Sequence, residues 1–426
     1  MNNSTPLLQS NQRVVKILLI IAGLLYLVSD VFYLLNRYEI HQGDLSLYYN
    51  IATQMLSGKI PYKDFRIEYP ALAILPIIIP GIVNHLFHGG FESYCAFFVV
   101  QNIIFAITTG FIIFFTKIGS QKTIYTLSTY VIICLFSLPV YLYRYDAFPA
   151  MLTSIVVYSI FQKPLVSGIA LSAAVAAKLY PIVMGPAIAI YFILNRNLKR
   201  GLIFLSGALL FLAVAGCTIL PFTGTEAFDF LRYHQIRGIQ IESVPGGLLL
   251  LANKVGLIPV RIIQNFGSLN IDAPTAKKVA EMLKLVVPVV FTFLFVFQCW
   301  VFYKENQIKG YIEQISVIRA LSMWIFIFLI FNKVLSPQYL IWLFPFIPFL
   351  NPGIRIKFTV ALILTITIFP GWYFYLVTIH PTFVALLNTR NLLLIWILAD
   401  LANLMVRSVF DKTARQDADG NELAIA

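Results

Sequence analysis

Long apolar segments alternate with short polar connectors along almost the whole chain. A helix needs about 20 mostly apolar residues to cross a bilayer, and the pattern predicts about twelve such helices. We expect them at residues 17–36, 93–116, 123–142, 147–162, 165–181, 182–195, 201–220, 283–303, 317–333, 338–350, 358–377 and 391–406. The sequence therefore predicts an all-α, polytopic fold in one transmembrane domain, residues 1–410, followed by a disordered cytoplasmic tail, residues 411–426.

Some apolar segments are too short for a straight span. Residues 71–87 are interrupted by Pro76 and Pro80, so we expect an interfacial or re-entrant helix on the outer face. The segments within 165–195 and at 338–350 are also short, and tilted, broken or partly re-entrant helices are alternatives there.

The basic residues predict the orientation, because connectors on the cytoplasmic side carry an excess of Lys and Arg. Arg13 and Lys16 precede the first segment, which we expect to be a retained helix rather than a signal peptide. With both termini cytoplasmic, the cytoplasmic connectors and tail hold Lys117, Lys122, Lys163, Arg196, Lys199, Arg200, Lys304, Lys309, Arg355, Lys357, Arg407, Lys412 and Arg415. The outer face then receives three segments, residues 37–92, 221–282 and the shorter 378–390.

The composition agrees with a membrane protein. Of the 426 residues, 59% are hydrophobic and 12% are charged, whereas soluble domains are about one-quarter charged. The net charge of +12 is spread over the connectors, which indicates membrane topology rather than nucleic-acid binding. The four cysteines stand singly and the five histidines lack metal-ligand spacing, so we expect no metal and no cofactor.

The stretch GDLSLYYNIATQMLSGKIPYKDFRIEYP, residues 43–70, lies in the first outer segment and holds the carboxylates Asp44, Asp64 and Glu68. Apolar residues recur at helical spacing after Asp44, and Gly58 ends the pattern. We expect an amphipathic helix that lies along the membrane surface. Asp44 is then an N-cap or a reactive base at that surface, and the two roles are compatible.

Two further charged residues lie near segment ends, where a charge is costly unless it faces water or a partner. Asp146, in YRYDAF, is a candidate for orienting a substrate, and the alternative is a local ion pair with Arg144. Lys178, in AAVAAKLYP, is a candidate for binding a phosphate, and the alternative is extension to the membrane surface. The small neighbours of Lys178 favour a position inside the bundle.

The second outer segment contains TEAFDFLRYHQIRGIQIESVPGG, residues 225–247. Thr225 can cap a helix that ends at Gly238, and an Asp229–Arg232 pair accounts for part of its charge. The residues left without an assigned partner are His234, Arg237 and Glu242.

A proline turn in NKVLSPQYLIW presents Lys333 and Gln338 at the outer surface, where Lys333 alternatively only anchors its helix. Carboxylates able to accept a proton and cations able to hold a phosphate thus gather on one face. We expect any chemistry to occur on that outer face.

Taken together, these motifs resemble membrane glycosyltransferases of the C superfamily, and more narrowly glycosyltransferase family 87, which includes polyprenyl-phosphate-mannose-dependent mannosyltransferases. The similar stretches are YYNIATQMLSGKIPYKDFRIEYPALA, RYDAFPA, AAKLYP, RYHQIRGIQIES and LSPQYLIWLFPF, in the family's order across residues 43–350. One departure is Tyr69-Pro70-Ala71, where the family usually has Tyr-Pro-Pro.

The resemblance implies that a sugar, such as the hexose mannose, is transferred with inversion from a polyprenyl phosphate to a lipid or glycan acceptor. It matches Asp44 to the catalytic base. Our candidates for binding the donor phosphate are Lys178, Arg237, Lys333 and His234. Our candidates for orienting the sugar or the acceptor are Asp146, Glu68, Asp64, Glu242 and Gln338.

A lipid or solute transporter without chemistry is the alternative from another class. A transporter would need a site near mid-membrane and usually internal repeats, and we see no repeat in this sequence. For the enzyme we expect the plasma membrane of a bacterium, with the active site on the outer face. Arabinose, glucose and galactose are alternatives to mannose, because no residue pattern specifies the sugar.

Overall fold

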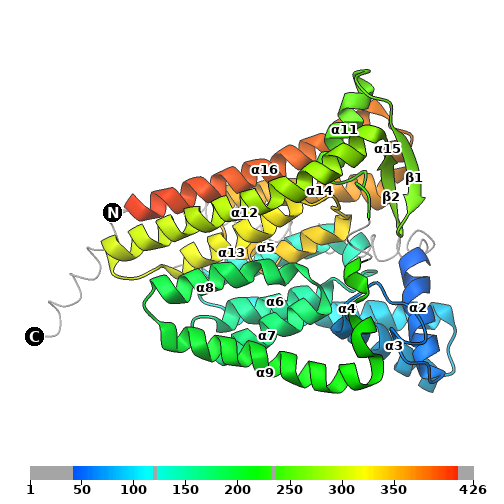
Figure 1. Ribbon diagram of the computed structural model, residues 1–426, viewed down its shortest axis with the longest axis horizontal. Coiled ribbons are helices and arrows are strands. Elements are labelled where there is room, and N and C mark those ends of the chain that lie inside the picture. Colours follow the sequence, from blue (N-terminus) through cyan, green and yellow to red (C-terminus); the bar gives the residue numbers. More distant parts are fainter. Residues whose placement is uncertain (1–41, 119–121, 233–236, 411–426) are drawn as a thin grey trace, which may run out of the picture.

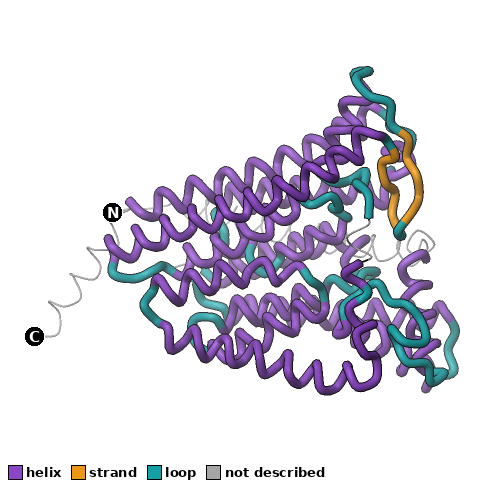
Figure 2. The backbone as a smooth tube through the Cα atoms, in the orientation of Figure 1, coloured by secondary structure: helices purple, strands orange, loops and turns teal. Residues whose placement is uncertain are grey.

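The computed structural model describes residues 42–118, 122–232 and 237–410, which form a mostly helical bundle (Figure 1). Figure 2 shows helices through most of this chain, with two strands at one end of the molecule. The first expected span, 17–36, and the tail, 411–426, lie outside the described residues.

Seven helices in the described part of the chain are long and apolar enough to cross a membrane. They are α4 (Phe91–Phe115), α5 (Thr123–Tyr141), α9 (Leu198–Thr223), α12 (Pro274–Lys309), α13 (Gln314–Phe331), α14 (Pro352–Ile366, continued by the π-helical turn η7, Thr367–Gly371) and α16 (Pro381–Phe410). Many of their large apolar side chains are exposed, as lipid-facing side chains are. The chain is therefore an integral membrane protein.

Shorter elements complete the structure. The shorter α-helices are α2 (Gln42–Leu56), α3 (Ile74–Leu86), α6 (Ala147–Ser159), α7 (Pro164–Ala177), α8 (Met184–Leu194), α11 (Val244–Lys254) and α15 (Tyr373–Val377). The 3₁₀ turns are η2 (Ala71–Ala73), η3 (Tyr180–Val183), η4 (Gly224–Phe228), η5 (Pro337–Leu343) and η6 (Ile347–Phe349). Because α6, α7 and α8 are shorter than the about 20 residues of a straight span, the expected total of about twelve spans stays a prediction.

The amphipathic helix expected after Asp44 is present as α2. Its apolar side, including Leu45, Tyr48 and Ala52, is buried, and Gly58 follows its end with φ +89°. Asp44 lies inside the first turn of α2, so the expectation that it is the N-cap is wrong.

The expected span at 338–350 is instead two 3₁₀ turns, η5 and η6, in the centre of the bundle. Pro337, Pro345 and Pro348 remove backbone donors that a continuous α-helix would need. Leu343 and Phe344 are fully buried there, so this segment is core rather than a lipid-facing helix.

The helix expected from Thr225 to Gly238 also differs. The chain forms η4 and a further helical turn that reaches Arg232, and from Arg237 it is not helical. Residues 233–236 lie outside the described residues. Arg237 therefore precedes an extended segment instead of lying on a helix face.

A β-hairpin, which the all-α expectation did not include, follows α11. Strands β1 (Arg261–Asn265) and β2 (Ser268–Asp272) pair antiparallel. The extended segment after Arg237 joins the hairpin edge, because the amide of Ile241 donates to Leu269 and the amide of Ile271 donates to Ile239, at 3.1 and 2.8 Å. These backbone bonds fix the hairpin to the same end of the bundle as α2 (Figure 1).

Helix α12 explains how the hairpin is supported. It has 36 residues, and at 1.5 Å per residue it is about 54 Å long, which exceeds the roughly 30 Å of the hydrocarbon core. It is therefore longer than a single crossing needs, and at the hairpin end of the bundle it packs against β2 and α11 (Figure 1).

Candidate functional site

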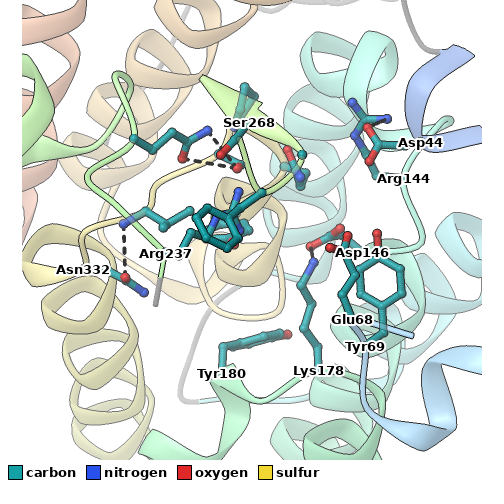
Figure 3. A pocket seen from close by; sticks show the side chains of 18 of the residues that line it. Asp44, Glu68, Tyr69, Arg144, Asp146, Lys178, Tyr180, Arg237, Ser268 and Asn332 are labelled. Atoms are coloured by element: carbon teal, nitrogen blue, oxygen red, sulfur yellow. Dashed lines mark hydrogen bonds and ion pairs between the residues drawn. The ribbon is translucent and has the colours of Figure 1, made fainter. Parts of the chain in front are cut away.

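A cavity of about 860 Å³ lies at the hairpin end of the bundle (Figure 3). Its wall comes from segments that are far apart in the chain: the start of α2, the loops before η2 and α6, the α7–η3 junction, the extended segment after Arg237, the hairpin, and the loop before η5. The charged residues that line it are Asp44, Glu68, Arg144, Asp146, Lys178, Arg237, Glu242 and Lys333.

Asp44 forms an ion pair with Arg144, with 2.5 Å between a carboxylate oxygen and Nη1. The Asp44 side chain is 36% exposed, so one side of its carboxylate faces the cavity. Asn102 holds the Arg144 turn by donating to the carbonyls of Leu142 and Arg144. Burial lowers the pKa of Arg144, but Asp44, Tyr48, Tyr69 and Asp146 together raise it more, and the net shift is upward. The guanidinium therefore stays charged and orients Asp44.

Asp146 pairs with Lys178, at 2.6 Å, and its same oxygen accepts a 2.6 Å hydrogen bond from the indole of Trp342. The expected alternative, a local pair between Asp146 and Arg144, is wrong, because Arg144 is paired with Asp44. The alternative for Lys178, that its side chain extends to the membrane surface, is also wrong. Its ammonium group lies in the cavity wall (Figure 3).

Aromatic rings enclose the Lys178 ammonium. It lies 4.7 Å from the ring centre of Tyr145, and 5.3 Å from those of Tyr339 and Trp342. Trp342 is itself stacked between Tyr180 and Tyr339, with ring centres 4.2 and 3.9 Å away. These rings favour the cation electrostatically and hold it in one position.

Another part of the wall is built around Gln240. The backbone N–H of Gln240 donates to the carbonyl of Lys333 at 2.9 Å. Its side-chain oxygen accepts a hydrogen bond from the backbone N–H of Leu335 at 3.0 Å. Its side-chain nitrogen donates to Ser336 and to Glu242, at 3.1 and 2.8 Å. Gln240 therefore joins the segment after Arg237 to the loop before η5.

Arg237 and Lys333 give this part of the wall a positive charge. The Nε of Arg237 is buried and has no hydrogen-bond partner within the described residues. Burial lowers the pKa of Lys333, and the nearby charges of Lys284 and Arg237 lower it further. Arg237 and Lys333 repel each other because both are positively charged. An anion bound between them would stabilise the charged form of both.

Glu242 is buried beside this positive region and is 4% exposed. Burial raises the pKa of Glu242 to about 7, although Arg390 acts in the opposite direction. The hydroxyl of Tyr373 donates to its carboxylate at 3.3 Å. A carboxyl group in this state can both donate and accept hydrogen bonds near neutral pH.

Most of the candidates named from the sequence lie in this one cavity: Asp44, Glu68, Asp146, Lys178, Arg237, Glu242, Lys333 and Gln338. Asp64 does not line it. Its exposed carboxylate accepts a 2.7 Å hydrogen bond from the amide of Ile60, so its role is to hold the loop. His234 lies outside the described residues.

Several residues of the site were not predicted from the sequence. Arg144 was considered only as a partner of Asp146, and the missed aromatic residues are Tyr69, Tyr145, Tyr180, Trp342 and Tyr373. The two charges of YRYD at the edge of an apolar segment were the available signal, because a charge there is costly unless it has a partner or faces water. The hairpin carried no such signal.

Among the described residues, no group of three or more His, Cys, Asp or Glu side chains is placed so that it could bind a metal ion. The cavity instead holds carboxylates whose positions are fixed by cations, together with a positive region that suits an anion. No protein-family model, curated protein or solved structure matches the chain.

Proposed function

We propose that this protein is an inverting glycosyltransferase that moves a sugar, such as a hexose, from a polyprenyl phosphate to a lipid or glycan acceptor. The observation that carries the proposal is the presence, in one cavity, of a partly exposed carboxylate, Asp44, and of two clustered cations, Arg237 and Lys333. A glycosyl transfer from a phosphate needs both: a base for the acceptor and positive charge for the leaving group.

In the proposed reaction, Asp44 takes the proton of an acceptor hydroxyl while that oxygen attacks the anomeric carbon. The bond from this carbon to the phosphate oxygen breaks, and its electron pair stays on the departing polyprenyl phosphate. Attack from the side opposite to the phosphate inverts the anomeric carbon. Arg237 and Lys333 stabilise the charge that develops on the phosphate, and the ion pair with Arg144 keeps Asp44 oriented.

The other polar residues of the cavity have positioning roles in this proposal. The Asp146–Lys178 pair is fixed by Trp342 and by the surrounding rings, so its hydrogen-bonding directions are preorganised. Lys178 adds positive charge near the donor phosphate. Glu68, Glu242 and Gln338 line the same space and would orient hydroxyl groups of the sugar or the acceptor.

We also propose that the cavity opens at the outer face of a bacterial plasma membrane. The connectors α6–α7, α8–α9 and α12–α13 lie together at the end of the bundle away from the hairpin (Figure 1), and basic residues occur in or beside each of them, including Lys163, Arg196 and Lys309. Such connectors are typical of the cytoplasmic side. This arrangement supports a cavity on the opposite side.

The direct test uses purified protein in detergent, a panel of radiolabelled polyprenyl-phosphate sugars (mannose, glucose, galactose and arabinose) and membrane lipid extract. We expect transfer of label from one donor, and we expect Asp44→Asn to lower the rate by about 100-fold or more, because it removes the general base. The matched control is Asp64→Asn, a carboxylate of the same loop that does not line the cavity, which should retain wild-type transfer.

Equal activity of the Asp44→Asn and wild-type proteins would remove Asp44 from the base role. If folded wild-type protein consumed none of the four donors, the enzyme proposal would be rejected in favour of a transporter.

A further inference from the structure

The tip of the β1–β2 hairpin lines the cavity, and the proposed chemistry gives it no role. Gln264, Phe266, Gly267 and Ser268 form part of the wall that also includes Asp44. The turn of the hairpin points toward α2 (Figure 1), and Ser268 lies across the pocket from the Asp44–Arg144 pair (Figure 3).

The backbone at the tip places an aromatic residue in an unfavourable conformation. Phe266 has φ +50° and Gly267 has φ +63°, so both residues of this two-residue turn are left-handed. Turns of this kind favour Asn-Gly, because a bulky residue with positive φ is strained. Strain of this type is often found at binding and catalytic sites, and Phe266 combines it with a position in the cavity wall, which makes it a candidate for a functional role.

The rest of the hairpin is held firmly. The side chain of Asn270, which is 1% exposed, donates to the carbonyl of Asn265 and to the hydroxyl of Ser268, each at 3.0 Å. The backbone of β2 is bonded on its other side to Ile239 and Ile241. The tip is therefore presented to the cavity on a fixed support.

The chemistry of the tip differs from that of the cationic wall. Gln264 offers an amide, Ser268 a hydroxyl and Phe266 an aromatic ring, and the tip has no charged side chain. An uncharged tip does not suit a phosphate. An amide and a hydroxyl beside an aromatic ring suit a ligand with many hydroxyl groups, because the polar groups bind hydroxyls and the ring packs on a carbon–hydrogen face.

We infer that the hairpin tip binds the hydroxyl-bearing part of the acceptor, a sugar or a polyol headgroup, and holds its attacking oxygen beside Asp44. This inference rests on the proposed function. It makes the acceptor a polyhydroxylated group and makes Phe266 a residue that determines acceptor affinity.

The test measures the two substrates separately. With the donor that the wild-type protein uses, the transfer rate is recorded against increasing membrane lipid extract and, independently, against increasing donor. We expect Phe266→Asn to raise the extract concentration at half-maximal rate by about tenfold, as loss of a ring contact would. We expect the donor KM to stay within about twofold. Asn suits the turn, so this variant should melt at or above the wild-type temperature.

Two further variants complete the test. Gln264→Ala, which removes an exposed side-chain amide from the tip, should also weaken the binding of the acceptor and leave the binding of the donor unchanged. Arg261 lies at the other end of β1 and does not line the cavity. Arg261→Ala should therefore leave both the extract concentration at half-maximal rate and the donor KM unchanged.

Unchanged dependence on the extract in Phe266→Asn, or an equal rise for donor and acceptor, overturns the inference while leaving the enzyme intact. A wild-type protein that consumes no donor overturns the proposed function, and the acceptor role of the tip falls with it.

Discussion

At the scale of single residues, the site depends on which partner each charge has. Asp44 and Asp146 are each paired with a cation from a distant part of the chain, whereas Glu242 is buried with mainly uncharged donors. This difference predicts that Glu242 titrates near neutral pH and that the stability of the protein changes with it.

The pKa of Glu242 is raised to about 7 in the folded protein. The folded state therefore holds this proton more tightly than the unfolded state, and the resulting stability is present below pH 4.5 and is lost as the pH rises toward 7. The difference corresponds to about 3 kcal/mol at most. We expect the wild-type melting temperature in detergent to fall more between pH 5 and 8 than that of Glu242→Gln.

The control for this titration is Glu281→Gln, whose carboxylate is 69% exposed and pairs with Lys284 on the same helix. It should follow the wild-type pH dependence. Parallel curves for wild type and Glu242→Gln would show that burial does not make Glu242 titrate in this range.

At the scale of elements, the contact between α7 and α9 depends on two glycines. A Cβ at Gly168 would lie 1.9 Å from the carbonyl oxygen of Phe204, and a Cβ at Gly207 would lie 2.2 Å from that of Leu165. Such contacts are possible only without side chains, as at other close helix crossings in membranes. Most of α9 is otherwise exposed, so this crossing is its main attachment to the bundle.

Gly168→Ala should therefore force α7 and α9 apart and destabilise the protein by about 1–3 kcal/mol, seen as a lower melting temperature in detergent. Gly185→Ala is the matched control, because Gly185 is also helical and has no atom within 4 Å of the added Cβ. A melting temperature for Gly168→Ala equal to that of the control would show that the helices move apart at no cost.

At the scale of the whole molecule, the hairpin, which lines the cavity, and the basic connectors lie at opposite ends of the bundle (Figure 1). The orientation can be tested with single cysteines in a Cys217→Ser background, since Cys217 is exposed. Ser57, after α2, and Lys163, between α6 and α7, are both exposed. We expect a membrane-impermeant maleimide to label Ser57→Cys in intact cells, and Lys163→Cys only after permeabilisation.

The reverse labelling pattern would place the cavity in the cytoplasm and contradict the proposed orientation. Labelling of both sites in intact cells would indicate leaky cells, which a cytoplasmic marker protein controls for.

Much of the helical architecture follows from the sequence alone, because lipid-spanning helices require long apolar segments. The apolar runs predicted α4, α5, α9, α13 and α16, and the helical spacing after Asp44 predicted α2. Residue chemistry also predicted which side chains matter: isolated charges in an apolar chain are costly, so Asp146 and Lys178 stood out without a structure.

The tertiary structure alone decided the partners and the shape of the site. The pairing of Arg144 with Asp44, the removal of Asp64 from the cavity and the core position of η5 and η6 depend on contacts between distant segments. The hairpin tip reached the cavity through backbone bonds to Ile239 and Ile241, which side-chain patterns do not encode. A sequence specifies local periodicity and the cost of burying each charge, whereas the partner that offsets this cost is determined only when the helices pack.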